Sequence, residues 1–180
     1  MKVAETRLAG VLIIEPKVFG DNRGFFQETF HRERYEKLAG IAQAFVQDNH
    51  SRSRRGVLRG LHLQTRRPQG KLVRVARGEV FDVVADINPN SASFGQWLGV
   101  TLSDENGRQV WIPPGYAHGF LTLSDVCDFV YKCTDYYDPA SETGVIWNDP
   151  DLAIAWPYDT PTVSEKDAKL PTLAALTRAP

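Results

Sequence analysis

The stretch Val73-Arg74-Val75-Ala76-Arg77-Gly78-Glu79-Val80-Phe81-Asp82-Val83-Val84 joins two valine-rich segments through a glycine. β-branched residues favour extended strands, and Arg77-Gly78-Glu79 predicts a turn, so we expect a β-hairpin here. Similar segments bounded by turn residues recur at 11–14, 25–30, 45–46, 72–87, 97–102, 109–112, 120–123 and 129–133. Short strands at this spacing are typical of a sandwich or barrel rather than of alternating strands and helices.

The pattern therefore predicts an all-β fold, an antiparallel jelly roll with a few short helices. A second hairpin is expected at Asp104-Glu105-Asn106-Gly107, because Asn-Gly suits positive φ. One helix is expected over 32–38, and another opens at Ser164, whose side chain is expected to cap its first turn. No repeat or linker interrupts residues 1–180, so we expect a single domain.

Composition narrows the function classes. The 180 residues are 42% hydrophobic and 24% charged, and the net charge is −1, so no overall field attracts nucleic acid or a membrane. The basic run Arg52-Ser53-Arg54-Arg55 is interpreted as a solvated loop rather than a nucleic-acid patch. Cys127 and Cys133 are expected to be buried thiols, too far apart to bridge. With no apolar leader or membrane-spanning stretch, a cytoplasmic protein is expected.

Two of the four histidines lie in glycine-rich contexts. His62 follows Gly60 on an expected strand, and His118 ends the turn Pro113-Pro114-Gly115-Tyr116-Ala117. The spacing of Gly107, Pro113, Gly115 and His118 resembles the second cupin motif, and that of Gly56 and His62 resembles the start of the first. The resemblance implies a cupin-type jelly roll.

The cupin metal ligands, however, are incomplete. Gln64 stands where the first motif has its second histidine, and Gln69 and Lys71 occupy the region of its glutamate; Thr122 replaces an asparagine of the second motif. A mononuclear site needs about three or four ligands, and a lysine ammonium repels a cation. We therefore expect no metal and no cofactor, and interpret the cavity as a site for acid–base chemistry.

A closer resemblance covers almost the whole chain. Its motifs are Phe19-Gly20-Asp21-Asn22-Arg23-Gly24-Phe25-Phe26, Phe45-Val46-Gln47-Asp48-Asn49-His50-Ser51, Val57-Leu58-Arg59-Gly60-Leu61-His62, Gly70-Lys71-Leu72-Val73-Arg74, Trp111-Ile112-Pro113 and Tyr131-Lys132-Cys133-Thr134. Together they resemble the dTDP-4-dehydrorhamnose 3,5-epimerase family. The resemblance implies an isomerase that converts dTDP-4-dehydro-6-deoxy-D-glucose into dTDP-4-dehydro-L-rhamnose, for rhamnose-containing surface polysaccharide such as the O-antigen of lipopolysaccharide.

Inversion beside a ketone needs a base on one face of the sugar, an acid on the other, and a cation or donor for the enolate oxygen. His62 is the candidate base, because an imidazole has an ordinary pKa of about 6.5. Tyr131 is the candidate acid and Lys71 the candidate partner of the enolate. The resemblance assigns Asp167 as the carboxylate that orients His62, and we favour this role over the alternative of a first-turn helix carboxylate.

The dTDP group needs cations, and no glycine-rich phosphate motif is present, so side chains must hold the diphosphate. Arg23 and Arg59 can bind phosphate oxygens bidentately. Tyr137, with Phe19 and Phe26, is expected to stack on the thymine. The resemblance adds substrate contacts at Glu28, Gln47, Asp48, Asn49, His118, Glu142 and Lys166.

Other functions remain open at this level. A relative that inverts one carbon only, or acts on another keto-sugar, would share the site. A non-catalytic sugar-nucleotide-binding jelly roll would keep the arginines and aromatics but would not need His62, Tyr131 and Lys71 together. A metal-dependent cupin oxygenase is disfavoured by Gln64 and Lys71. We also expect a homodimer in which residues 19–30 reach the partner's site.

Overall fold

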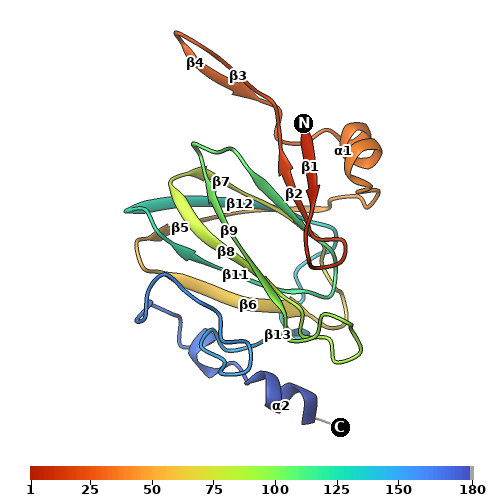
Figure 1. Cartoon of the computed structure of the whole chain (residues 1–180), viewed down its shortest axis with the longest axis vertical. Helices are drawn as coiled ribbons and strands as arrows, with labels where there is room; N and C mark the ends of the chain where they lie inside the picture. Colours follow the sequence, from red (N-terminus) through yellow and green to blue (C-terminus); the bar gives the residue numbers. More distant parts are fainter. Residues whose placement is uncertain (179–180) are drawn as a thin grey trace.

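The computed structural model describes residues 1–178 and shows two antiparallel sheets packed face to face (Figure 1). The six-stranded sheet has the order β1 (Lys2–Glu5), β2 (Leu12–Glu15), β10 (Gln109–Ile112), β7 (Lys71–Arg77), β12 (Val126–Cys133), β5 (Gln47–Arg54). The five-stranded sheet has the order β13 (Glu142–Gly144), β6 (Leu58–Gln64), β11 (Ala117–Thr122), β8 (Glu79–Ala85), β9 (Trp97–Ser103). This is the all-β jelly-roll sandwich that the sequence predicts.

The two predicted hairpins are wrong in their pairing. β7 and β8 are both strands, but β7 pairs with β10 and β12, whereas β8 pairs with β9 and β11. The chain crosses from one sheet to the other at Gly78, because a single residue is too short for the usual hairpin loop. The turn at 104–108 likewise connects β9 of one sheet to β10 of the other, with φ of 58° at Gly107. Valines from the two arms therefore meet across the core instead of side by side.

The polar strand β5 was not predicted from the sequence. The predicted loop at 52–55 is wrong, since Arg52, Ser53 and Arg54 end this strand and only Arg55 lies beyond it. Its alternate side chains face the interior or the solvent, which an apolar-run criterion does not detect. The segment predicted at 25–30 is a strand only over 24–27, and residues 45–46 precede β5 without belonging to it.

Few helices cover the sandwich. The predicted helix at 32–38 is confirmed as α1 (Arg32–Ala39). The predicted helix near Ser164 is a single 3₁₀ turn, η1 (Asp167–Lys169), in which the Ser164 hydroxyl accepts a hydrogen bond from the Asp167 amide at 3.0 Å. A further short helix, α2 (Leu173–Arg178), was not predicted. Within residues 1–178, no helix is long and apolar enough to cross a membrane.

The core occupies only part of the space between the sheets. A cluster that includes Val73, Val80, Phe120 and Phe129 fills one part, and Cys127, a free buried thiol as predicted, belongs to it. Cys133 is also free and buried. Elsewhere between the sheets polar and charged side chains enter the interior among apolar ones, and this is where the site described below lies.

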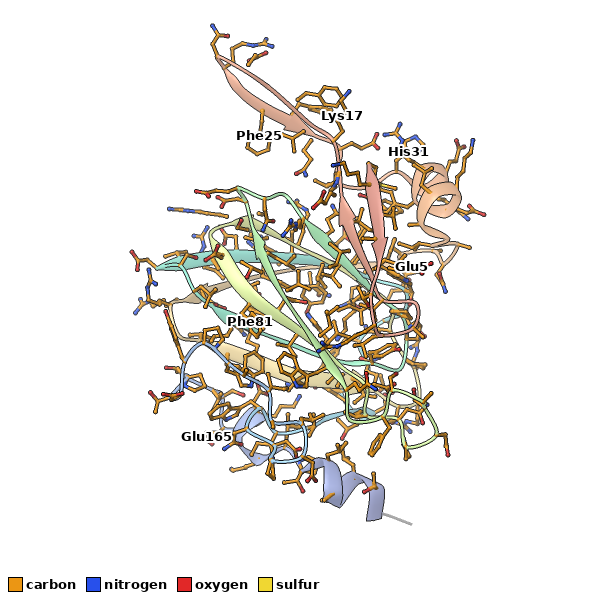
Figure 2. All side chains as sticks on the ribbon, in the orientation of Figure 1. Glu5, Lys17, Phe25, His31, Phe81 and Glu165 are labelled. Carbon is orange, nitrogen blue, oxygen red and sulfur yellow. The ribbon has the colours of Figure 1, made fainter. Side chains whose placement is uncertain are left out.

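The hairpin of β3 (Val18–Asp21) and β4 (Gly24–Gln27) stands clear of the sandwich in Figure 1. Its strands pair only with each other, and Figure 2 shows Phe25 on this hairpin, clear of the sandwich. The side chains of Phe25 and Phe26 are 70% and 67% exposed. Such an exposed apolar surface is typical of a contact with another molecule.

The crossover at Gly78 yields a stability prediction. Its φ is 84°, and a Cβ would lie 2.3 Å from the Val126 carbonyl oxygen. Gly78→Ala should lower the free energy of unfolding by about 2–4 kcal/mol. Gly95→Ala is the matched control, because its φ of 76° is similar but no atom lies within 4 Å of its Cβ; its cost should be about 1 kcal/mol. Urea unfolding measures both, and equal losses would contradict this role of the crossover.

Candidate active site

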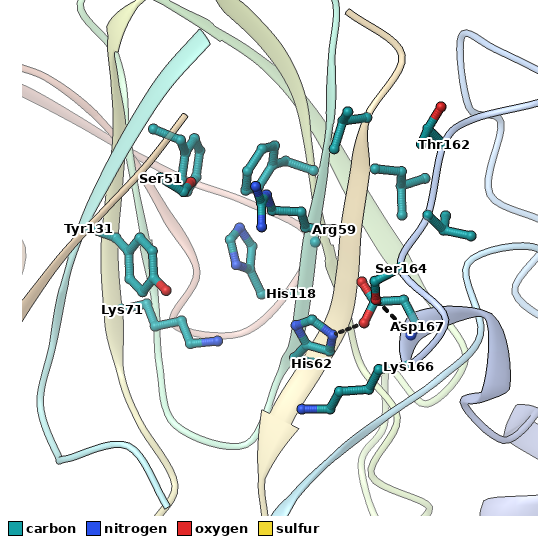
Figure 3. A pocket seen from close by; sticks show the side chains of 16 residues that line it. Ser51, Arg59, His62, Lys71, His118, Tyr131, Thr162, Ser164, Lys166 and Asp167 are labelled. Atoms are coloured by element: carbon teal, nitrogen blue, oxygen red, sulfur yellow. Dashed lines mark hydrogen bonds and ion pairs between the residues drawn. The ribbon is translucent and has the colours of Figure 1, made fainter. Parts of the chain in front are cut away.

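A cavity of about 530 Å³ lies between the sheets, and an adjoining one of about 300 Å³ shares His62, Lys71 and Tyr131 with it (Figure 3). β6 contributes His62 to one wall, while β7 and β12 contribute Lys71 and Tyr131 to the other. The larger cavity is also lined by four other predicted residues, Arg59, His118, Lys166 and Asp167. The smaller one is also lined by four, Gln47, Asn49, Tyr137 and Glu142.

His62 and Asp167 form a hydrogen-bonded pair. The Nε2 of His62 lies 2.7 Å from the Asp167 carboxylate, which also accepts the Gly60 amide at 3.1 Å. Burial of Asp167 raises the pKa of its carboxyl, but the hydrogen bonds from His62 and Gly60 outweigh it, so the pKa is lowered overall. Because Nε2 donates to this carboxylate, the neutral imidazole has its lone pair on Nδ1. His62 is thus arranged as a base.

Tyr131 and Lys71 face His62 across the cavity (Figure 3). Burial raises the pKa of the Tyr131 phenol to about 12, so it keeps its proton at neutral pH. Burial lowers the pKa of Lys71, while the nearby Cys133, Glu142 and Asp82 act in the opposite direction. A proton donor and an amine therefore lie opposite the base.

Arg59 and His118 line the same cavity. The Nε of Arg59 donates to the Ser53 hydroxyl at 3.0 Å, which leaves other guanidinium N–H groups for a ligand. The Nε2 of His118 lies 2.8 Å from the carboxylate of Asp82. Sequence reasoning missed Asp82, although its signal is visible as the one charged residue in the apolar segment 80–85.

Glu142 connects three predicted residues. It accepts hydrogen bonds from the Tyr137 hydroxyl at 2.7 Å and from the Lys166 ammonium, and its other oxygen lies 3.9 Å from the Nδ1 of His62. Burial of Glu142 raises the pKa of its carboxyl, but the bonds from Lys166 and Tyr137 outweigh this, so the pKa is lowered overall. Glu142 is therefore a carboxylate at the junction of the two cavities.

Gln64, which stands where a cupin ligand is expected, is used structurally. Its amide donates to the carbonyls of Arg67 at 2.7 Å and Tyr136 at 3.2 Å, and its oxygen accepts the Asp138 amide at 2.9 Å. It thereby holds the loop that carries Tyr137. Within residues 1–178, no three His, Cys, Asp or Glu side chains are arranged to hold a metal ion.

Five predicted residues are not brought to the cavity of their own chain. Arg23, Phe19 and Phe26 lie on the projecting β3–β4 hairpin, where Arg23 pairs with Asp21. Glu28 follows the hairpin and pairs with Arg34, and Asp48 pairs with Lys132 at 2.9 Å. Asp48 turns outward because successive side chains of a strand alternate, and its neighbours Gln47 and Asn49 face inward.

Comparison with known proteins shows the family to which the chain belongs. A family model described as dTDP-4-dehydrorhamnose 3,5-epimerase matches residues 5–175. The chain belongs to the dTDP-4-dehydrorhamnose 3,5-epimerase family.

Similar members support this membership. The dTDP-4-dehydrorhamnose 3,5-epimerase of Salmonella typhimurium is 55% identical over 175 residues, which cover 96% of each chain. The crystal structure of dTDP-6-deoxy-D-glucose-3,5-epimerase from Legionella pneumophila, in complex with dTDP-4-keto-L-rhamnose, is 56% identical with a TM-score of 0.93 and covers 96% of this chain and 93% of that one. A dTDP-4-dehydrorhamnose 3-epimerase from Streptomyces niveus is 40% identical and covers 93% of this chain and 81% of its own.

These comparisons confirm the predicted family, the cupin-type jelly roll and the activity as a 3,5-epimerase, which is an isomerase acting on a small nucleotide sugar. The roles of individual residues in this epimerase, and the expectation that it needs no metal or cofactor, stay predictions.

The His62–Asp167 pair yields a prediction on rate. Asp167→Asn keeps the shape of the side chain but removes the charge that orients His62 and stabilises its protonated form. We expect kcat to fall by roughly 10³–10⁴-fold with little change in the affinity for dTDP, as when a triad carboxylate is neutralised. Turnover assays with calorimetric titration of dTDP measure both, and an unchanged kcat would contradict the pairing.

The same variant has a pH signature. The folded-state pKa of Asp167 lies below its ordinary value of 3.8, so its charge stabilises the fold above that value and the contribution is lost as the pH falls through the folded pKa. The difference in Tm between the wild type and Asp167→Asn should therefore be largest near about pH 6 and shrink towards about pH 3. A difference in Tm that stays constant between about pH 6 and pH 3 would contradict the lowered pKa of Asp167.

Proposed function

We propose that the cavity inverts C3 and C5 of dTDP-4-dehydro-6-deoxy-D-glucose to give dTDP-4-dehydro-L-rhamnose, which supplies rhamnose for surface polysaccharide such as O-antigen. The observation that carries this proposal is the opposition of His62, backed by Asp167, to Tyr131 and Lys71 across one cavity (Figure 3). A base and an acid on opposite walls are what inversion beside a ketone requires.

In this scheme His62 removes the proton from C3 or C5 with Nδ1, while Asp167 stabilises the imidazolium. The 4-keto group makes both C–H bonds acidic, and the electrons move onto its oxygen to form an enolate. Lys71 stabilises that oxygen, and the developing negative charge in turn favours the ammonium form of Lys71 against the effect of its burial.

Tyr131 completes each inversion by returning a proton to the opposite face of the sugar. Its high pKa keeps the phenol protonated until an enolate carbon is in reach. The phenolate that results is disfavoured in this buried position, so Tyr131 takes up a proton from water, and the His62 imidazolium releases its proton to water before the second inversion. The same pair of residues can then act on both carbons that flank the ketone.

The dTDP group is assigned to the polar rim of the site. Arg59 is the candidate ligand of the diphosphate, and Tyr137 is the candidate stacking partner of the thymine. Gln47, Asn49, Glu142 and Lys166 are close enough to Tyr137 or the smaller cavity to contact the nucleotide or the sugar. No contact with nucleic acid or a membrane is part of the proposal, and the reaction is placed in the cytoplasm.

Deuterium incorporation tests these roles. In D₂O the wild type should place deuterium at both C3 and C5, and label at one carbon only would contradict double epimerisation. Tyr131→Phe should still exchange protons on the face of His62, but product should form about 10²–10⁴-fold more slowly because the opposite face lacks its acid. NMR of the recovered sugar measures exchange and inversion separately, and exchange lost together with inversion would contradict the role of Tyr131.

His62→Ala distinguishes catalysis from binding alone. This variant should lose both exchange and inversion while binding dTDP nearly as well as the wild type. Full turnover would contradict the proposed base.

Inversion of one carbon only is the alternative that the sequence left open. The Streptomyces niveus relative, 40% identical, carries the name of such a 3-epimerase. Single inversion predicts deuterium at a single carbon, so the labelling experiment separates the two candidates.

The projecting hairpin supports a homodimer. The residues predicted to bind dTDP there, Arg23, Phe19 and Phe26, do not reach the cavity of their own chain, and the two phenylalanine side chains are more than half exposed. We propose that the β3–β4 hairpin reaches the partner's cavity and completes its nucleotide pocket. A symmetric dimer would then bury the exposed apolar surface twice.

Mixed dimers test this arrangement. A His62→Ala chain and an Arg23→Ala/Phe26→Ala chain, each weakly active alone, should recover about a quarter of wild-type activity when co-expressed. In the mixed dimer, the chain with an intact His62 receives an intact hairpin from its partner. No recovery in mixed dimers of confirmed composition would contradict the exchange of hairpins.

A further inference from the structure

One buried charge has no part in the scheme above. Asp82 lies in the middle of β8, and its side chain is 1% exposed. Its neighbours in the core include Val80, Val84 and Phe120, and its Oδ1 has no hydrogen-bond partner among the described residues. A carboxylate in such surroundings costs several kcal/mol unless it is paired. Its contact with His118, which lines the cavity, indicates a role there.

Among the described residues, the Asp82 side chain makes its one hydrogen bond with His118. Its Oδ2 lies 2.8 Å from the Nε2 of that imidazole. The ring of His118 stacks on Phe129, with centroids 6.0 Å apart, so both its position and its plane are held. Since Nε2 is occupied by the carboxylate, Nδ1 is the ring nitrogen left for a ligand. The pair repeats the arrangement of His62 and Asp167 on a neighbouring strand.

The register of the sheet places this second pair beside the base. His118 on β11 lies directly opposite His62 on β6, whereas Arg59 is opposite Phe120. His118 therefore lies beside the base as its direct cross-strand neighbour, whereas Arg59 lies one cross-strand pair further along the sheet. Because His62 must reach C3 and C5, His118 lies at the level of the sugar, and the diphosphate belongs to the level of Arg59.

We propose that Asp82 is a positioning residue that holds His118 with an Nδ1–H group directed at the 4-keto oxygen of the sugar. His118 and Lys71 then stabilise the enolate oxygen together, from the two opposite walls of the cavity. Because the Nε2–H group is used by the carboxylate, Nδ1 carries a proton only in the doubly protonated ring, so this form of His118 is part of the proposal. The inference rests on the proposed 3,5-epimerisation and deepens it.

The charge of Asp82 has a second effect in the same place. It favours the ammonium form of Lys71 and so partly offsets the burial that lowers the pKa of that group. The other groups that act on Lys71 in this direction are Glu142 and the Cys133 thiol. Loss of Asp82 would therefore weaken both partners of the enolate oxygen.

The test is Asp82→Asn, which keeps the volume of the side chain and removes its charge. We expect kcat to fall by about 10²–10³-fold, while the Kd for dTDP stays within about twofold of the wild type. Arg59→Ala is the contrasting variant and should weaken dTDP binding instead. Asp86→Asn, which changes another buried carboxylate outside the cavity, is the matched control and should leave kcat unchanged.

Two further readouts separate positioning from a merely structural role. Asp82→Asn should slow the His118→Ala variant far less than it slows the wild type, because the carboxylate acts mainly through the imidazole and only the smaller effect on Lys71 is left. Nitrogen-15 NMR of His118 should show protons on both ring nitrogens in the wild type and an altered ring signal in Asp82→Asn. If Asp82→Asn fails to fold, this wild-type signal and the effect of His118→Ala on kcat and dTDP affinity still decide the matter.

Several outcomes would overturn the inference. A loss of dTDP affinity in Asp82→Asn or His118→Ala as large as the loss of kcat/KM would assign His118 to the diphosphate. Fully additive losses in the double variant would show that Asp82 does not act through His118. Deuterium incorporation by the wild type tests the 3,5-epimerisation by itself, so its failure is distinguishable from failure of the role of Asp82.

Discussion

The hydrogen bond between His62 and Asp167 connects strand β6 to the C-terminal turn that carries Asp167. Asp167 belongs to a C-terminal turn that packs on β6 through the Gly60 amide and the imidazole. A carboxylate that is 4% exposed is tolerated only because these donors, with Ser164 holding its backbone, replace water. The contact therefore positions the C-terminal turn, selects the tautomer of His62 and closes one wall of the cavity. Without it the sheet would still carry a histidine, but not a directed base.

The path of the chain between the sheets supplies the opposite wall. Because the chain changes sheet at Gly78 and again near Gly107, β7 and β12 face β6 and β11 across the interior. Lys71 and Tyr131 therefore come from one sheet, and His62 and His118 come from the other. This architecture supports the proposed removal and return of a proton on opposite faces of one sugar, since the frame holds the groups apart before the substrate binds.

Polar residues inside the sandwich are used in two ways. Gln64 stands at the sequence position of a cupin ligand, and its side chain forms hydrogen bonds with the loop that carries Tyr137. Asp82 and Asp167 instead pair with the Nε2 atoms of His118 and His62, which leaves the Nδ1 atom of each imidazole for the cavity. The polar part of the interior is thus built from paired acids, bases and amides.

The sequence by itself determined the strand-rich class, the family and most of the inner site: long ordered motifs contain His62, Lys71 and Tyr131, and valine-rich segments predict strands from local sterics. It did not determine which strands pair, and both predicted hairpins failed for that reason. Nor could it show that Asp82 is buried behind His118, or that Asp48 faces away while Asn49 faces inward. Local propensity sets the extension of the backbone, whereas partners, facing and burial depend on contacts between residues far apart in the chain, which only the packed tertiary structure decides.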